Sequence, residues 1–291
     1  MRIDVHQHIW LDPVVDVLAR RTAAPRIHAG RDGLVLELAC EPPSRIELDE
    51  IDQRAGMLAL DGIDTAIVSL SAALGVESLP LDEAEAVLSE YDRTVSQLPT
   101  GFAAWASIPL ADLDPRRVDA LVAEGFAGLC LPATALDSEH ALYRLGPVLE
   151  RLSHYDAPVF VHPGPVADQA VGHEPGWWPG CVSYVGQLQA AWTAWMAFGA
   201  ATHPRLRIVF AALAGLAPLQ CERLAARGWP GGASGPNVFY ETSSYGRRAV
   251  TALESVVDPG QIVFGSDRPV VAPAPPHSDA IVEANPARLL R

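Results

Sequence analysis

Eight short runs of apolar and β-branched residues recur along the chain, and a longer segment with helical periodicity follows most of them. The expected strands are residues 2–8, 64–70, 102–108, 125–131, 158–162, 206–211, 238–242 and 262–266. The expected helices are residues 47–60, 81–98, 115–124, 140–154, 183–201, 218–227, 246–257 and 278–290. This alternation favours a closed (β/α)8 TIM barrel over an open doubly wound sheet, whose first strand would be followed by a Gly-rich loop.

Two connections are longer than a barrel needs. Residues 11–45 contain two β-like runs around Gly30 to Gly33, which indicate a hairpin over the barrel mouth. After the fifth expected strand, a loop rich in Gly, Pro and Trp has the composition of a lid. We find no linker that would divide the chain, so we expect one distorted barrel domain over residues 1–291.

The composition excludes several kinds of chemistry. All 21 basic residues are arginine, so a P-loop lysine, a Schiff-base lysine and a carboxylated lysine that bridges two metal ions are ruled out. The formal net charge of -14 argues against nucleic acid or an anionic membrane as a partner. Four scattered cysteines and an N-terminus unlike a secretory signal favour a cytoplasmic protein. The expected partner is a small-molecule substrate.

The first expected strand carries Asp4, His6 and His8 at alternating positions, which places all three side chains on one face. The two imidazoles, roughly 6–7 Å apart along a strand, can converge on one metal ion. A buried face made of these residue types is costly unless each polar group has a partner. The alternative is an edge strand on which the same residues are solvated.

Two further residues lie at the ends of expected strands. His162 ends the run APVFVH and Asp267 follows the run QIVFGS. Catalytic groups of TIM barrels come from the C-terminal ends of their strands. With His6 and His8, these residues would make a nitrogen and oxygen site suited to zinc or another divalent first-row metal.

These motifs resemble the amidohydrolase superfamily, and more narrowly its branch that includes aminocarboxymuconate-semialdehyde decarboxylase. The resemblance rests on DxHxH at residues 4–8, the histidine of VFVHPGP, GSDRP near the C-terminus, and their order along the whole chain. It implies a distorted barrel with one catalytic divalent metal, often zinc, held by His6, His8, His162 and Asp267. It also implies either hydrolysis or non-oxidative decarboxylation.

The chain departs from the family pattern at one position. The family's sixth strand normally ends in a histidine that polarises the substrate or activates water, whereas this chain has Ala212 in the segment IVFAALAGLAP. Three interpretations stay open. Asp267 acts alone as the base, a loop histidine substitutes (His173 or His277), or the chain has lost hydrolysis and kept the pocket for another use.

Other residues are candidates for binding the substrate. Arg268 would be a guanidinium clamp for a carboxylate, or would instead pair with a neighbouring acid. Trp10, and Trp178 beside Trp177, would form an aromatic wall, or would pack beneath loops.

Two patterns leave the position of side chains undecided. Tyr240 and Glu241 alternate, so only one of them faces the barrel interior. The segment AAWTAWMAFG carries more apolar residues than one buried stripe needs, which suits either core packing or a homodimer interface.

The leading functional prediction is a metal-dependent hydrolase of a small carbonyl or ester-type compound, in which Asp267 moves the proton of an activated water. The first alternative is a decarboxylase of an aromatic or unsaturated acid. The second is a degenerate family member that binds a ligand without turnover.

Overall fold

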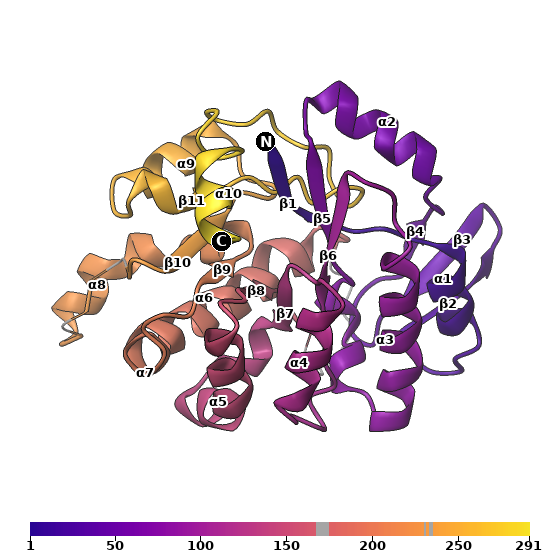
Figure 1. Ribbon diagram of the computed structural model, residues 1–291, viewed down its shortest axis with the longest axis horizontal. Helices are drawn as coiled ribbons and strands as arrows, with labels where there is room; N and C mark the ends of the chain where they lie inside the picture. Colours follow the sequence, from indigo (N-terminus) through magenta and orange to yellow (C-terminus); the bar gives the residue numbers. More distant parts are fainter. Residues whose placement is uncertain (167–174, 230, 233–234) are drawn as a thin grey trace.

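Eight parallel strands form one sheet in the computed structural model, which describes residues 1–166, 175–229, 231–232 and 235–291. Their order is β1-β5-β6-β7-β8-β9-β10-β11 (Figure 1). The bounds are β1 Ile3–Gln7, β5 Thr65–Val68, β6 Phe102–Ala106, β7 Gly128–Pro132, β8 Val159–His162, β9 Ile208–Phe210, β10 Val238–Glu241 and β11 Ile262–Val263. The strands follow each other around the sheet in chain order, as the expected TIM barrel requires.

The segment after β11 closes the barrel against β1. The amide of Val5 donates to the carbonyl of Phe264 at 2.9 Å, and the amide of Asp267 donates to the carbonyl of His6 at 2.9 Å. The carboxylate of Asp4 accepts from the amide of Ser266 at 3.0 Å and from the side chain of Gln7 at 2.7 Å. These bonds join the two chain ends and place Asp267 beside the first-strand histidines.

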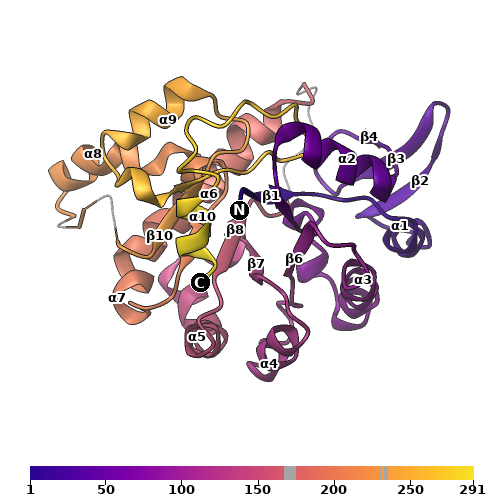
Figure 2. The ribbon, with the colours of Figure 1, turned by 45° about the horizontal axis from the view of Figure 1, so that its top comes forward.

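Helices cover the outside of the sheet, as Figure 2 shows for α3, α4 and α5. Their bounds are α1 Asp12–Ala19, α2 Ile51–Asp61, α3 Leu81–Val95, α4 Arg116–Ala123, α5 Glu139–His154, α6 Tyr184–Ala194, α7 Ala200–Thr202, α8 Cys221–Ala226, α9 Arg247–Glu254 and α10 Ala284–Leu289. Short 3-10 or π turns separate several of them. None of the described helices has both the length and the apolar character needed to cross a membrane.

An aromatic layer fills the barrel beneath the histidines. Trp105 of β6 is fully buried, and its indole N–H donates to the carbonyl of Val5 at 2.8 Å. Its ring lies 5.4 Å from that of Phe160, which in turn lies 4.8 Å from the ring of His6. This aromatic layer packs against His6 from inside the barrel and keeps its ring at the end of the strand.

The expected hairpin is present as β2 (Arg26–Gly30) and β3 (Gly33–Glu37), to which a third strand, β4 (Ser44–Ile46), is added. Helix α1 precedes it within the segment that the sequence analysis treated as a long connection. The loop after β3 reaches α6, where the hydroxyl of Tyr184 donates to the carboxylate of Glu41 at 2.7 Å.

The apolar residues at the end of α6 mostly serve the core. Trp192 and Trp195 are almost fully buried, whereas Phe198 is 44% exposed. The indole N–H of Trp192 donates to the hydroxyl of Tyr240 at 3.2 Å, which fixes Tyr240 on the helix side of β10. Core packing therefore accounts for both tryptophans, and the homodimer stays a prediction.

Candidate metal centre

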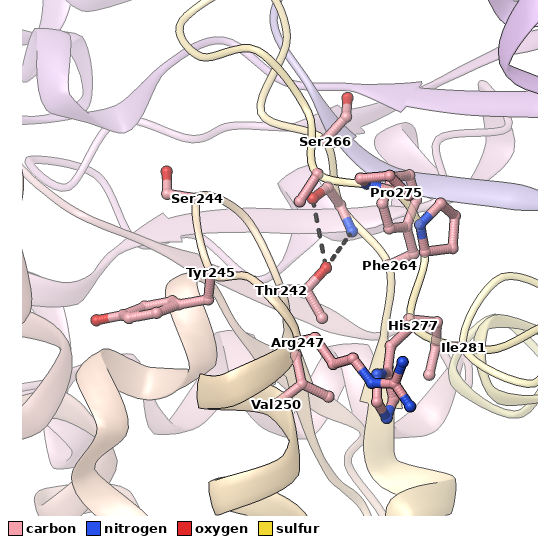
Figure 3. A pocket seen from close by; sticks show the side chains of 13 residues that line it. Thr242, Ser244, Tyr245, Arg247, Val250, Phe264, Ser266, Pro275, His277 and Ile281 are labelled. Atoms are coloured by element: carbon pink, nitrogen blue, oxygen red, sulfur yellow. Dashed lines mark hydrogen bonds between the residues drawn. The ribbon is translucent and has the colours of Figure 1, made fainter.

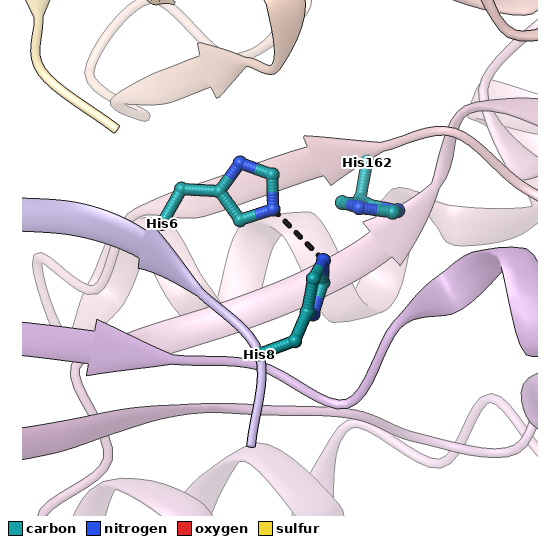
Figure 4. A group of neighbouring side chains, drawn as sticks. All are labelled: His6, His8 and His162. Atoms are coloured by element: carbon teal, nitrogen blue, oxygen red, sulfur yellow. Dashed lines mark hydrogen bonds between the residues drawn. The ribbon is translucent and has the colours of Figure 1, made fainter. Parts of the chain in front are cut away.

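Three buried imidazoles converge where β1 and β8 end (Figure 4). His6 lies on β1, His8 directly after it, and His162 is the last residue of β8; each is at most 5% exposed. One ring nitrogen of each lies within 4.8 Å of those of the others. The sequence prediction that these residues form one group is therefore met by the geometry.

Each imidazole has an acceptor behind its Nδ1 atom. His6 Nδ1 lies 3.2 Å from Glu241 Oε2, His8 Nδ1 lies 3.0 Å from the carbonyl oxygen of Ser69, and His162 Nδ1 lies 2.8 Å from the carbonyl oxygen of Pro163. A neutral ring that donates through Nδ1 leaves Nε2 as a bare lone pair. Three such lone pairs that face one another form a binding site for a cation.

The carboxylate of Asp267 completes the group. Its Oδ1 atom lies 3.4 Å from His8 Nε2 and 3.6 Å from His6 Nε2, while those two nitrogens are 3.2 Å apart. Two ligands about 2.0–2.1 Å from a tetrahedral ion lie about 3.4 Å apart. The spacing, the burial and the donor types of these residues thus fit a divalent metal ion.

The charges of the group depend strongly on one another. Burial lowers the pKa of His6, but the carboxylates of Glu241 and Asp267 outweigh it and raise that pKa to about 9. Burial and the neighbouring imidazoles lower the pKa of His162 well below its usual value. For Asp267 burial raises the pKa, and the nearby imidazoles outweigh it and lower the pKa. Without a cation, His6 holds a proton that metal binding would displace.

The backbone also marks Asp267 as unusual. Its φ is 58°, in the left-handed region that aspartate tolerates better than most residues. Strained residues of this kind cluster at functional sites, where the surrounding structure holds them. The hydrogen bond from the Asp267 amide to the carbonyl of His6 is part of that support.

Glu241 is the residue that sequence reasoning did not assign. Alternation along β10 left two choices, and the structure places Tyr240 against Trp192 on the helix side and Glu241 inside the barrel next to His6. One sequence signal for the buried position of Glu241 was present in the segment after β11, the strand that pairs with β10. A Cβ atom on Gly265 would lie 1.9 Å from Glu241 Oε1, so glycine there leaves the space that the carboxylate occupies.

Arg268 has an acidic partner outside the centre. Its Nη2 atom lies 2.7 Å from Asp61 Oδ2 on α2, and its Nη1 atom lies near Met57 of the same helix. This corresponds to the structural pairing that the sequence analysis gave as the alternative to a substrate clamp. Asp4 likewise binds Ser266 and Gln7.

The aromatic candidates differ in their surroundings. Trp10 is 7% exposed and packs in an apolar cluster with Val14 and Leu18 of α1, the packing that the sequence analysis gave as the alternative; its contact with a substrate stays a prediction. Trp178 is 39% exposed beside Trp177, and its contact with a substrate stays a prediction. His173 lies outside the described residues.

His277 occupies a small separate cavity instead of the metal centre (Figure 3). The cavity has a volume of about 20 Å³ and also borders Thr242, Arg247 and Ser266. His277 Nε2 lies 3.5 Å from Glu254 Oε2, so this histidine is already directed toward an acid on α9. A space of this size holds about one water molecule.

Fold and site together define a TIM barrel with a buried histidine group at the ends of its strands, where enzymes of this fold carry their active sites. No protein-family model and no curated protein matches the sequence. Solved structures match over nearly the whole chain. IDCase of Metarhizium anisopliae has a TM-score of 0.79 at 18% identity, covering 100% of this chain and 97% of that one.

Two further matches also cover most of the chain. An amidohydrolase II structure has a TM-score of 0.75 at 17% identity and covers 100% of this chain and 99% of its own. The 5-carboxyvanillate decarboxylase of Novosphingobium aromaticivorans, complexed with manganese and a nitrobenzoic acid, has a TM-score of 0.65 at 16% identity and covers 98% and 89%. Decarboxylases named for 5-carboxyvanillate or 2,6-dihydroxybenzoate recur among the matches. These likenesses establish the fold and agree with the family resemblance of the sequence.

Proposed function

We propose that this protein is a metal-dependent decarboxylase of an aromatic or unsaturated carboxylic acid, acting at the centre formed by His6, His8, His162 and Asp267. The observation that carries the proposal is the convergence of three imidazole Nε2 atoms and one carboxylate on a single buried point. The recurrence of decarboxylases among proteins of the same fold favours this reaction over hydrolysis, which the sequence analysis placed first.

A divalent ion held here would bind oxygen atoms of the substrate and draw electron density from the carbon that loses carbon dioxide. Zinc is the metal expected from the sequence, and manganese is the metal of the fold relative from Novosphingobium aromaticivorans. The four candidate ligands suit either ion, because imidazole and carboxylate are ligands of both.

Asp267 would manage the proton of the reaction. The bond between the substrate carbon and its carboxyl carbon breaks, the electron pair stays on the substrate carbon, and a proton replaces the departing carbon dioxide. Asp267 is the acidic side chain that lies against both first-strand histidines and is partly open to the barrel mouth, with 16% of its side chain exposed. It can therefore exchange a proton with a substrate bound beside the imidazoles.

Ala212 lies at the position where the family pattern has a histidine, and its methyl group cannot polarise a carbonyl or accept a proton from water. The residue is partly exposed, and its amide donates to Glu241 at 3.1 Å, so it lies at the border of the centre.

Measurement of the metal content of the purified protein, followed by carbon dioxide release from a panel of aromatic and unsaturated acids, tests the proposal. We expect about one ion per chain, loss of turnover after chelation, and recovery with Zn²⁺ or Mn²⁺. Incorporation of labelled water into the product without carbon dioxide would indicate hydrolysis instead. A protein that binds no metal would exclude both reactions.

A further inference from the structure

The fully buried carboxylate of Glu241 is surrounded by hydrogen-bond donors. Oε1 accepts from the amide of Ser243 at 2.5 Å, while Oε2 accepts from the hydroxyl of Ser243 at 2.7 Å and from the amide of Ala212 at 3.1 Å. His6 Nδ1 lies 3.2 Å from the same Oε2 atom. A buried carboxylate is tolerated only when donors of this kind compensate for the lost water, so the site is built for an acceptor at this position.

We propose that Glu241 is the positioning residue of the metal centre: it fixes the His6 ring with Nε2 facing His8 and Asp267, and it ties that ring to the Ala212–Leu216 turn. This inference rests on the proposed function insofar as it assumes that the centre holds a metal. Glu241 acts through His6 and touches neither metal nor substrate.

The first argument concerns the tautomer of His6. An acceptor-only group at Nδ1 keeps the proton of a neutral ring on that nitrogen and leaves Nε2 free as a ligand. His8 and His162 are held in the same way by the backbone carbonyls of Ser69 and Pro163. The hydroxyl of Ser69 also lies 3.3 Å from His8 Nδ1, but the carbonyl of Ser69 would remain after that side chain is replaced. For His6 the Nδ1 partner is the Glu241 carboxylate, which a mutation can remove.

The second argument concerns charge. Three neutral imidazoles and Asp267 bring one negative charge to a divalent ion, which would leave one positive charge in a buried site. The carboxylate of Glu241 supplies the second negative charge next to His6. A buried ion is far less costly when its neighbourhood is neutral in total.

The third argument concerns the turn that follows β9. Residues Ala212 to Leu216 all have positive φ, between 46° and 63°, although only Gly215 is a glycine. Left-handed backbone is disfavoured for residues other than glycine. The amide of Ala212 at the start of this turn donates to Glu241, so the same carboxylate that orients His6 also anchors a strained segment.

Glu241→Gln tests this role, because the amide matches the shape of the carboxylate. In either orientation of that amide, its NH2 group would face a hydrogen-bond donor that now binds a carboxylate oxygen. We expect the affinity for Zn²⁺ or Mn²⁺, measured by titration calorimetry, to fall roughly 10- to 100-fold. Long-range ¹H–¹⁵N spectra of the histidine rings should show His6 moving toward the Nε2–H tautomer. Wild-type affinity and an unchanged His6 tautomer in a folded variant would overturn the inference.

Two further variants make the result decisive. Glu77→Gln removes another fully buried carboxylate and should leave metal affinity unchanged. Ser243→Ala removes one hydrogen-bond donor to Glu241 and leaves His6 unchanged. It serves as the test if Glu241→Gln does not fold. A reduced metal affinity of Ser243→Ala then supports the inference, and a wild-type metal affinity rejects it. A wild-type protein without metal affinity would overturn the proposed function and, with it, this role of Glu241.

Discussion

Asp267 Oδ1 lies 3.4 Å from His8 Nε2, although the two residues are 259 positions apart in the sequence. The contact exists because the segment after β11 closes the barrel against β1, with the Asp267 amide donating to the carbonyl of His6. The contacts that close the barrel therefore also bring Asp267 to the histidines of the centre. A change that loosens this seam should weaken both stability and metal binding.

Replacement of a histidine ligand should remove the metal. We expect His162→Ala to lower metal affinity by more than about 100-fold, because loss of an outer partner alone costs roughly 10- to 100-fold. Inductively coupled plasma analysis of the purified variant would measure this. His140→Ala, on α5 away from the centre, is the matched control, and retention of one ion per chain by His162→Ala would contradict the ligand assignment.

Asp267→Asn separates proton transfer from binding. The amide keeps the shape of the side chain and an oxygen that can face the ion, but it cannot exchange a proton at neutral pH. We expect turnover to fall at least about 100-fold, since a positioned acid or base contributes about 10²- to 10⁴-fold. Carbon dioxide release, compared at equal metal occupancy, measures the effect. Full activity in this variant would mean that another group moves the proton.

Ala212→His asks whether the missing histidine explains the chemistry. Histidine is among the residues that tolerate the positive φ of 46° at this position. We expect no gain in the hydrolysis of simple esters, because the proposed reaction does not activate water. An increase of about tenfold or more would instead favour the hydrolase that the sequence analysis placed first.

Glu77 should make stability depend on pH. Burial raises the pKa of its carboxyl group from 4.5 to about 7, because it outweighs the hydrogen bonds that lower this pKa. The folded state therefore holds a proton that the unfolded state loses between pH 4.5 and 7, and stability falls as the pH rises through that interval. The loss from this group is about 3 kcal/mol.

Glu77→Gln should remove this loss. Relative to the wild type, the variant should become more stable between pH 5 and pH 8, as measured by urea denaturation at several pH values. Glu47→Gln changes an exposed acid, with 80% of its side chain accessible, and should show no such trend. Parallel pH curves for Glu77→Gln and the wild type would refute the assignment.

Much of the fold was predictable because its signals are local. The observed β7, at Gly128–Pro132, and β8, at Val159–His162, fall within three residues of the expected runs, since strands buried on both faces are read as continuous apolar segments. Helix α1 was missed because its eight residues, Asp12–Ala19, lie in a segment that also contains the hairpin. The expected lid loop lies partly outside the described residues.

The sequence by itself determined that two histidines share a face of the first strand, that His162 ends another strand and that Asp267 follows the last one. Period-two alternation and strand ends are properties of a short segment. Only the tertiary structure decided that Glu241 faces His6 while Tyr240 faces Trp192, and that Arg268 pairs with Asp61. It also decided which carbonyls fix the tautomers of His8 and His162. Those contacts depend on how distant strands and helices are placed against each other, and no local spacing encodes that placement.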